Sequence, residues 1–571
     1  MPDTTPIIEF RDFSFKYDAQ QEKTLKNISL RIRKGEKVLI AGPSGCGKST
    51  LIHCINGLIP HSYRGTVSGS LTIDGKDATA LGIFDRSKII GTVLQDSDGQ
   101  FVGLTVAEDI AFALENDSVP GPELQERVRK AAETVGIASH LHHSPSQLSG
   151  GPKQKVSIAG IIVDDVDVLL FDEPLANLDP AAGKYAVEMI DELQKKTGAA
   201  VIIVEHRLED VLWRDVDRIV LMDHGEIISD TSPDELLAAD LLAQSGIREP
   251  LYLTALKYAG VDVNSAMKPH SIRDIVLGKT SREKVRNWYQ HTPPSKPRGS
   301  RENVLSVEDL AFSYGNGKKA ISGISVSFRE GEMAAIVGTN GAGKSTFSKL
   351  LCGFEKQQSG VIRFRGNDLA GMSIKERADH IGYVMQNPNQ MISQVMIFDE
   401  VALGLKTRGI SESETRERVE KTLKICGLWP FRNWPVSALS YGQKKRVTIA
   451  SILVLNPEVI ILDEPSAGQD YRHYTEIMEF LSKINRLGVT VILITHDLHL
   501  MLEYADRAVV FHNGKILADD SCANILGNEE ITCEANLKRT SLYDLAEKCG
   551  IEDAADFVQR FIDYERREVR S

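Results

Sequence analysis

The chain contains the same ordered set of short motifs twice, and this duplication constrains its fold more than any other feature. A glycine-rich segment begins at Gly42 and again at Gly338, 296 positions later, and an apolar run ends at Asp172 and again at Asp463, 291 positions later. So regular an offset over hundreds of residues indicates duplicated domains. Because 571 residues are too many for one hydrophobic core, we expect two large units of similar fold.

The apolar runs of both copies have the pattern of strands that are buried on both faces, because they are short and continuous and carry no charge. A glycine-rich turn follows the first run of each copy. The sequence therefore predicts an α/β fold of two tandem domains, each with a mostly parallel sheet and a helical subdomain. The runs are Val38–Ala41, Val168–Phe171 and Ala200–Val204 in the first copy and Ala334–Val337, Val459–Leu462 and Val489–Ile494 in the second.

A proline-rich polar stretch, His291–Ser300, separates the copies because it cannot hold a core. Residues 246–300 hold ten Lys or Arg against four Asp or Glu. One interpretation of this basic segment is a contact with RNA or with anionic lipid. Our working interpretation is a solvated linker that lies on acidic surfaces of the large domains. Pro250–Val261 and Ser541–Ile551 predict short amphipathic helices ended by glycine. The predicted segments are large domains at 1–245 and 301–530, a basic linker with a short helical appendage at 246–300, and a C-terminal helical appendage at 531–571.

The glycine-rich segments have the composition of phosphate-binding loops. A turn between a buried strand and a helix start directs backbone N–H groups at one point, and glycine is needed where a side chain would exclude phosphate oxygens. We expect Lys48 and Lys344 to contact the β- and γ-phosphates of ATP, and Ser49 and Ser345 to offer hydroxyl groups to Mg²⁺. The loops are Gly42, Pro43, Ser44, Gly45, Cys46, Gly47, Lys48, Ser49 and Thr50, then Gly338, Thr339, Asn340, Gly341, Ala342, Gly343, Lys344, Ser345 and Thr346.

Acidic residues and a histidine follow two buried strands in each copy. A carboxylate at Asp172 or Asp463 would face the phosphate loop and hold Mg²⁺ through water. The next residue, Glu173 or Glu464, is placed to polarise the attacking water. An acid at a strand end is often only a cap and a lone histidine a core residue, but the repeated placement favours the catalytic interpretation. The histidines predicted to contact the γ-phosphate are His206 and His496.

Two further matched pairs lie near the predicted sites. Gln95 and Gln386 sit in loops after short strands, where a neutral amide can contact the metal and the attacking water and still move as a switch. Tyr17 and Tyr314 are the last residues of similar short segments near the start of each copy. At these positions an aromatic ring could stack on adenine. For a single aromatic residue a core position would be the simpler interpretation, but both copies carry it.

A helix is predicted after Leu148–Pro152 in the first copy and after Leu439–Gln443 in the second. Serine is a good N-cap, so simple capping is one interpretation of these segments. The other is that the helix N-terminus binds the γ-phosphate of ATP held by the other copy. The residues placed to do so are Ser149, Gly151, Ser440 and Gly442.

Taken in order, these motifs resemble those of the ABC-type ATPases over both halves of the chain. The resemblance implies a head-to-tail, intramolecular pairing of two cassettes, with ATP and Mg²⁺ at both seams and with loops around Asp179 and Asp470 crossing between them. One implied site combines Lys48, Ser49, Gln95, Asp172, Glu173 and His206 with Ser440 and Gly442. The other combines Lys344, Ser345, Gln386, Asp463, Glu464 and His496 with Ser149 and Gly151.

Two positions depart from the common Leu-Ser-Gly-Gly-Gln signature of that family. Tyr441 replaces the first glycine, and Pro152 replaces the glutamine. Proline lacks an N–H group, but near a helix start that donor would be unpaired anyway. The lost amide puts a ribose contact in doubt rather than the phosphate contact, so we expect both sites to hydrolyse ATP.

Finer details are similar to the energy-coupling factor ATPases, which drive micronutrient uptake. These details are the Gln100–Phe112 segment, the Val204–Arg207 segment and the Leu-Ser-Tyr-Gly-Gln signature. The resemblance implies the ATP-hydrolysing motor of an importer for a vitamin or metal, peripheral at the cytoplasmic face of the cell membrane. Its implied partners are integral membrane coupling and substrate-binding subunits. Residues expected to touch them are Phe101, Val102, Met391 and Ile392.

Two other functions stay open on the sequence. A soluble double-cassette protein acting on ribosomes or DNA is favoured by the basic segment, but Pro293, Pro294 and Pro297 interrupt it and no long charged helical hairpin occurs. A sugar-importer double-cassette ATPase is disfavoured because both copies keep the Lys, Asp, Glu and His of the motifs. The net charge of −12 argues against nucleic acid as a general partner.

Composition adds three expectations. No run approaches 18 consecutive apolar residues, so we expect no membrane span. The first residues lack a basic stretch and an apolar stretch, so we expect no signal peptide. The seven cysteines are scattered without metal-ligand spacing, which indicates reduced thiols.

Overall fold

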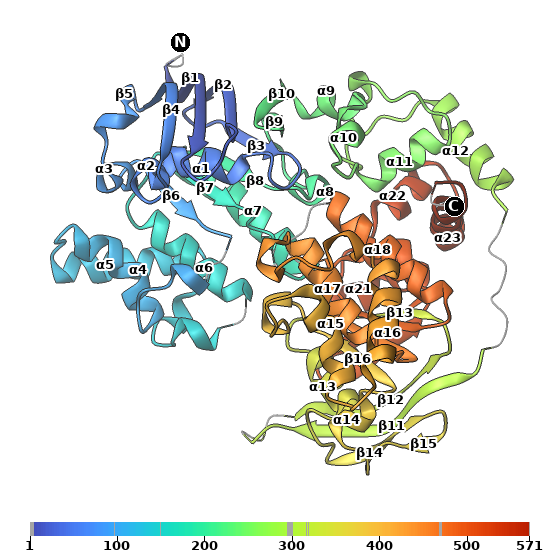
Figure 1. The fold of residues 1–571 in the computed structure, drawn as a ribbon. Helices are drawn as coiled ribbons and strands as arrows, with labels where there is room; N and C mark the ends of the chain where they lie inside the picture. Colours follow the sequence, from blue (N-terminus) through green and yellow to red (C-terminus); the bar gives the residue numbers. More distant parts are fainter. Residues whose placement is uncertain are drawn as a thin grey trace. The chain divides into compact units, whose positions relative to one another are not determined.

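The computed structural model forms two compact units, which are described separately. The first comprises Met1–Trp288 with Asp470–Arg472, and the second comprises Tyr289–Gln469 with His473–Ser571. Figure 1 colours the chain from its N-terminus in blue to its C-terminus in red. The structure describes residues 5–95, 98–148, 150–176, 178–293, 301–315, 317, 319–466 and 471–569.

The first unit is built on two sheets. A four-stranded antiparallel sheet has the order β2-β1-β4-β5, and a six-stranded sheet has the order β10-β9-β3-β8-β7-β6. In the larger sheet β10 is the antiparallel edge strand and the other strands are parallel. The strands are β1 Pro6–Tyr17, β2 Leu25–Arg33, β3 Lys37–Ala41, β4 Gly65–Ile73, β5 Lys76–Asp77, β6 Ile90–Val93, β7 Val168–Asp172, β8 Ala200–Val204, β9 Arg218–Asp223 and β10 Glu226–Thr231.

Helix α1 begins directly after the glycine-rich loop and is buried in the core of this unit. The core joins α1 to β1, β2 and one face of the larger sheet, as in Phe10, Leu51, Val168 and Ile202. Helices α4, α5 and α6 pack on one another and form the helical subdomain (Figure 1). Helices up to residue 291 are α1 Lys48–Asn56, α2 Leu58–His61, α3 Ile83–Ser87, α4 Val106–Asn116, α5 Gly121–Thr134, α6 Gly150–Ile162, α7 Pro180–Thr197, α8 Leu208–Val211, α9 Pro233–Ala238, α10 Leu241–Gln244, α11 Leu251–Tyr258 and α12 Lys279–His291.

The second unit repeats the two sheets with the orders β12-β11-β14-β15 and β16-β17-β18-β13-β19-β20. Its core joins helix α13 to both sheets, as in Phe328, Phe347 and Ile461. The strands are β11 Asn303–Ser313, β12 Lys319–Arg329, β13 Met333–Gly338, β14 Ser359–Phe364, β15 Asn367–Asp368, β16 Ile381–Val384, β17 Val459–Asp463, β18 Thr490–Ile494, β19 Arg507–His512 and β20 Lys515–Asp520.

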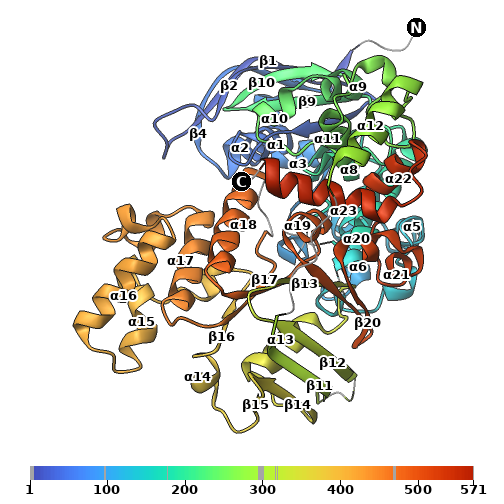
Figure 2. The same cartoon turned by 90° about the vertical axis from the view of Figure 1, so that its right-hand side faces the viewer.

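Helices α15, α16 and α17 of the second unit form a cluster apart from its four-stranded sheet (Figure 2). The helices are α13 Lys344–Cys352, α14 Ile374–Arg377, α15 Ile397–Lys406, α16 Glu412–Ile425, α17 Tyr441–Leu453, α18 Tyr471–Arg486, α19 Leu498–Tyr504, α20 Cys522–Gly527, α21 Glu529–Glu534, α22 Ser541–Lys548 and α23 Ala554–Tyr564. The α/β fold predicted from the sequence is confirmed in both units, because each predicted buried run forms a strand of a larger sheet.

The two short helices predicted after the large domains are confirmed as α11 and α22. Each is followed by a glycine with positive φ, Gly260 at 70° and Gly550 at 69°, which ends the helix. All seven cysteines are described, and they are free thiols. Within the described ranges, no helix has both the length and the hydrophobicity needed to cross a bilayer.

The basic segment 246–300 is more ordered than a solvated linker in its described part, and this corrects our working interpretation. Leu253 and Leu256 of α11 and Val285 of α12 are fully buried. Lys257 forms ion pairs with Asp240 and Glu249. The charge pattern concealed Val285, because it lies among the basic residues of α12, whereas the helix that contains Leu253 and Leu256 was predicted from its apolar pattern. Pro294 and Pro297 lie outside the described residues.

Candidate active sites

Neighbouring strand ends meet at one edge of the larger sheet in each unit. In the first unit, parallel pairing aligns Ile40 of β3 with Val204 of β8, and Val204 with Asp172 of β7. Segments that follow these strands therefore lie side by side, which is where ligands bind in open parallel sheets. The second unit aligns Ile336, Ile494 and Asp463 in the same way. The predicted residues at these edges are Lys48, Gln95, Asp172, Glu173 and His206, and Lys344, Gln386, Asp463, Glu464 and His496.

The phosphate loops connect β3 to α1 and β13 to α13. Gly47 and Gly343 immediately precede the helices and have φ of 107° and 104°, a left-handed conformation that favours glycine. Ser49 and Ser345 lie exposed on the first helical turns, where their hydroxyl groups can reach a ligand. The free N–H groups of a helix N-terminus attract an anion, so both loops fit a phosphate.

A buried ammonium group lies inside each loop. Lys48 Nζ donates to the carbonyl oxygens of Gly42 at 2.7 Å and Pro43 at 2.9 Å, and Lys344 forms the same two bonds in the second unit at 2.8 and 2.9 Å. The two lysines are only 7% and 6% exposed. A charge that is so strongly desolvated gains from an anionic partner, which again fits a phosphate group.

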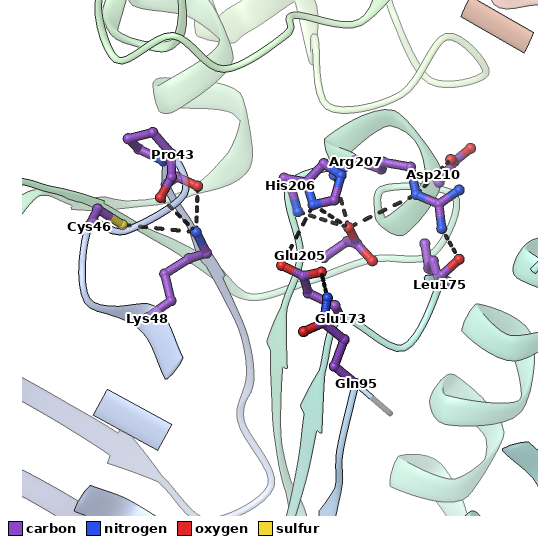
Figure 3. A network of polar contacts seen from close by, with 11 residues as sticks. Pro43, Cys46, Lys48, Gln95, Glu173, Leu175, Glu205, His206, Arg207 and Asp210 are labelled. Atoms are coloured by element: carbon purple, nitrogen blue, oxygen red, sulfur yellow. Dashed lines mark hydrogen bonds and ion pairs between the residues drawn. The ribbon is translucent and has the colours of Figure 1, made fainter. Parts of the chain in front are cut away.

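Glu173 lies between Gln95 and His206 (Figure 3). Its Oε2 accepts a hydrogen bond from Gln95 Nε2 at 2.6 Å, and its Oε1 lies 3.9 Å from His206 Nδ1. The backbone of Glu173 has φ of 47°, an uncommon value for a residue other than glycine and one that clusters at functional sites. Burial raises the pKa of the Glu173 carboxyl, as is typical of functional sites.

An aspartate directly precedes the candidate glutamate in each unit, Asp172 in the first and Asp463 in the second. Burial raises the pKa of Asp172 to about 6, and repulsion from Glu173 adds to that rise. In the second unit, Tyr383 Oη donates to Asp463 Oδ2 at 2.8 Å. A hard cation such as Mg²⁺ prefers oxygen ligands and would offset the crowding of carboxylates. Asp172 with Ser49, and Asp463 with the matching serine of α13, therefore fit a magnesium ion.

A metal site formed by protein side chains alone would need several ligand side chains close together. The described residues contain no group of three or more His, Cys, Asp or Glu side chains that could hold a metal ion.

Glu464 is held differently from Glu173. Its Oε2 accepts a hydrogen bond from the backbone N–H of His496 at 3.4 Å, and His496 Nε2 lies 3.3 Å from its Oε1. Its φ is again 47°. Burial raises the pKa of Glu464 to about 8, against the opposing effect of Lys344. Both glutamates thus meet the geometry and the environment expected of a group that takes up a proton.

Sequence reasoning assigned no role to Glu205, which precedes the first histidine. Its side chain is fully buried, and its Oε1 accepts hydrogen bonds from the backbone N–H groups of His206 at 2.9 Å and Arg207 at 3.2 Å. The imidazole Nδ1 of His206 lies 3.2 Å from the same oxygen. The second unit has Thr495 at this position. The sequence signal that could have pointed to Glu205 is that a carboxylate precedes only one of the two matched histidines.

The predicted adenine-stacking tyrosines lie against the phosphate loops. Tyr17 Oη is 3.1 Å from Thr50 Oγ1, and Tyr314 Oη is 3.2 Å from Thr346 Oγ1. The Tyr314 ring is partly exposed, and Tyr17 is half-buried. The hydroxyl contacts place each tyrosine beside its loop, and adenine stacking stays a prediction.

The signature segments begin helices α6 and α17. Ser440 caps α17: its hydroxyl accepts from Gln443 N at 3.3 Å, and the Gln443 side chain accepts from Ser440 N at 3.0 Å. Gly151 and Gly442 lie in the first turns. Ser149 and Asp470 lie outside the described residues, whereas Asp179 caps α7 through Ala182 N. Capping is therefore observed at Ser440, and phosphate binding across cassettes stays a prediction.

Comparison with known protein families decides what kind of protein carries these two sites. The ABC transporter family profile matches residues 25–176 and 321–467, which together are more than half of the chain. The chain belongs to the ABC transporter ATP-binding proteins. Cassettes of this family are ATPases, so the chain is an ATPase with two cassettes. A second profile, described as ATP-binding cassette cobalt transporter, matches residues 239–312.

Relatives extend over the whole chain. An ABC transporter ATP-binding protein of Clostridium perfringens is 58% identical over 98% of both chains, and one of Enterococcus faecalis is 55% identical over 99% of both. A solved structure, cbiO1 from Clostridium perfringens, part of the ABC transporter complex cbiONQ, is 34% identical over 41% of this chain and 95% of its own, with a TM-score of 0.38.

The raised pKa of Glu464 predicts a pH-dependent stability of this ATPase without nucleotide. A native pKa above the ordinary 4.5 means that the charged form costs stability, so the cost is absent below about pH 4.5 and grows until the pH exceeds about 8. We expect Glu464→Gln to raise the melting temperature at pH 8 by several degrees and to have little effect at pH 4.5. The exposed Glu479→Gln is the control. Equal effects of Glu464→Gln at both pH values would contradict the assignment.

Proposed function

We propose that this ATPase is the motor subunit of an energy-coupling factor type importer for a vitamin or metal micronutrient. It would work at the cytoplasmic face of the cell membrane with integral membrane subunits. Two complete motif sets support the proposal, and so does the match of residues 239–312 to a family described by cobalt transport. Two of the basic residues that favoured the nucleic-acid alternative are engaged within the first unit: Arg273 lies over the Trp213 ring at 4.2 Å, and Lys257 is ion-paired.

The residues of each cassette divide the work of hydrolysis. Lys48 and Lys344 bind the β- and γ-phosphates, and Mg²⁺, when bound, neutralises charge on the phosphate oxygens. Glu173 accepts the proton of the attacking water, while Gln95 keeps its carboxylate oriented through the 2.6 Å hydrogen bond. Glu464 does the same in the second cassette. His206 and His496 contact the γ-phosphate. Completion of each site by the signature segment of the other cassette stays a prediction.

One observation carries the importer proposal: both cassettes expose an apolar side chain at the same place. Leu104 is 81% exposed just before α4, and Val395 is 74% exposed just before α15, 291 positions later. Each follows the loop of the switch glutamine. In the second cassette Val395 borders a hollow lined by Asn389, Ile392, Gln394, Val395, Val436, Ser437 and Lys444. Apolar groups repeated in two polar loops suit a protein partner better than solvent.

Among the residues predicted to touch the membrane subunits, Val102 is 63% exposed, and Phe101, Met391 and Ile392 are partly exposed. Sequence reasoning chose these positions and missed Leu104 and Val395. A contact made by all of them would place the partner beside the glutamine loop, where a change at the γ-phosphate could be transmitted to it.

Cysteine crosslinking tests the docking surface. In a Cys533→Ser background, which removes the exposed native thiol, we expect Leu104→Cys and Val395→Cys to crosslink to co-expressed integral membrane subunits. Leu487→Cys, at a residue that is 69% exposed elsewhere on the second unit, serves as the matched control and should not crosslink. Crosslinks only from position 487, or recovery of the chain with ribosomes rather than membrane proteins, would argue against an importer.

Glutamate variants test the hydrolytic roles. Glutamine preserves size but cannot accept a proton, so removal of general-base assistance should slow the altered site by roughly 10²–10⁴-fold. We expect Glu173→Gln and Glu464→Gln each to remove more than half of the steady-state ATPase rate while ATP binding persists, since the phosphate loops are untouched. Glu479→Gln should match the unmodified chain. A single variant at Glu173 or Glu464 with unchanged turnover would show that its site does not hydrolyse ATP.

A further inference from the structure

We propose that Tyr441, Lys444 and Lys445 are positioning residues that tie the switch-glutamine loop of the second cassette to the start of its own signature helix. The loop, defined as residues 385–392, follows β16 and carries Gln386. Through this tie, a displacement of Gln386 would move the signature segment at the N-terminus of α17 with it. We call the three residues the α17 brace.

The brace consists of hydrogen bonds from one helix face to the loop. Lys445 Nζ donates to the carbonyl oxygens of Gln386 at 2.6 Å and Met385 at 3.1 Å. Tyr441 Oη, one turn earlier, donates to the same Gln386 carbonyl at 3.3 Å. Lys444 Nζ reaches Asn389 Oδ1 at 3.3 Å. Residues four apart on a helix lie on one face, so Tyr441 and Lys445 converge on one acceptor.

Lys445 is a buried charged residue whose hydrogen bonds to the loop compensate for its loss of water. Its side chain is 1% exposed. A buried ammonium group is costly unless polar partners compensate it, and the partners here are the two loop carbonyls. Burial lowers the pKa of Lys445 to about 8, while the nearby carboxylates of Asp463 and Glu464 oppose the effect. Loss of the loop contacts would leave this buried ammonium group without its two carbonyl acceptors, so loop and helix stabilise each other.

The first cassette has other residues at the positions of Tyr441 and Lys445. Gly150 occupies the position of Tyr441 and has no side chain, and Gln154 occupies the position of Lys445. The Gln154 amide donates instead to the carbonyl oxygen of Pro174 at 2.6 Å, next to Glu173. The bonds made by Tyr441 and Lys445 are therefore not repeated in the described part of the first cassette, which keeps a lysine, Lys153, at the position of Lys444. They give Tyr441 a role, where the sequence showed only a departure from the common signature.

Hydrogen exchange of the full chain tests the brace. Tyr441→Phe removes only a hydroxyl group, and Lys445→Gln installs the residue that the first cassette accommodates. We expect the double variant to raise amide exchange in 386–392 by about tenfold or more, the change expected when charge-assisted hydrogen bonds are lost. The ATPase kcat should fall about threefold to tenfold, with the KM for MgATP within about twofold, because the loop positions Gln386 and the phosphate loop is untouched.

Matched controls are Tyr185→Phe, at an exposed tyrosine, and Lys406→Gln, at an exposed lysine of α15. Neither should alter exchange in 386–392 or kcat. Unchanged exchange in this loop in the double variant would overturn the proposal. So would an increase spread evenly over α15, α16 and α17, because the three residues would then support subdomain packing rather than the loop. The exchange measurement requires no membrane partner, so its outcome is independent of the importer proposal.

Discussion

Parallel pairing of the central strands is the constraint on which both candidate sites depend. β3 pairs with β8 and β8 with β7, so the phosphate loop, the histidine and the Asp-Glu pair follow strand ends that are in register. The second cassette repeats this with β13, β18 and β17. A slip of one residue would turn every side chain of a strand to the opposite face, and the packing of one face of each sheet against its core cluster opposes it.

Much of this arrangement could be predicted from the sequence because its signals are local. Glycine-rich turns, continuous apolar runs and acids at strand ends each require only a short window, and the duplication tests each one a second time. The residues expected at each site follow from the same motifs, whereas the order of the strands in the sheet was not predicted and comes from the structure. The helix α11 was predicted because its apolar pattern and final glycine are also local.

Other features could not be predicted because they depend on contacts between distant segments. Lys445 donates to backbone carbonyls about 60 positions earlier, and backbone acceptors leave no trace in residue types. The exposure of Leu104 and Val395 depends on where α4 and α15 begin relative to the rest of each cassette. Helix α12 was missed because its single fully buried apolar residue, Val285, lies among basic residues.

The two cassettes share a fold but hold their candidate catalytic glutamates differently. Glu173 is bonded by the switch glutamine, and a second carboxylate, Glu205, lies beside its histidine. Glu464 is bonded by the backbone of His496 instead, and the glutamine loop is held by α17. The same chemistry can therefore be expected from both sites at unequal rates, since the groups that position Gln95 and Gln386 differ.

The central claim is that each cassette forms a working nucleotide site. The most direct test is the number of MgATP molecules retained by the Glu173→Gln, Glu464→Gln double variant in equilibrium dialysis. We expect two per chain, reduced to one by a further Lys48→Ala or Lys344→Ala substitution. A value of one before either lysine is changed would contradict the claim, because one of the two motif sets would then hold no nucleotide.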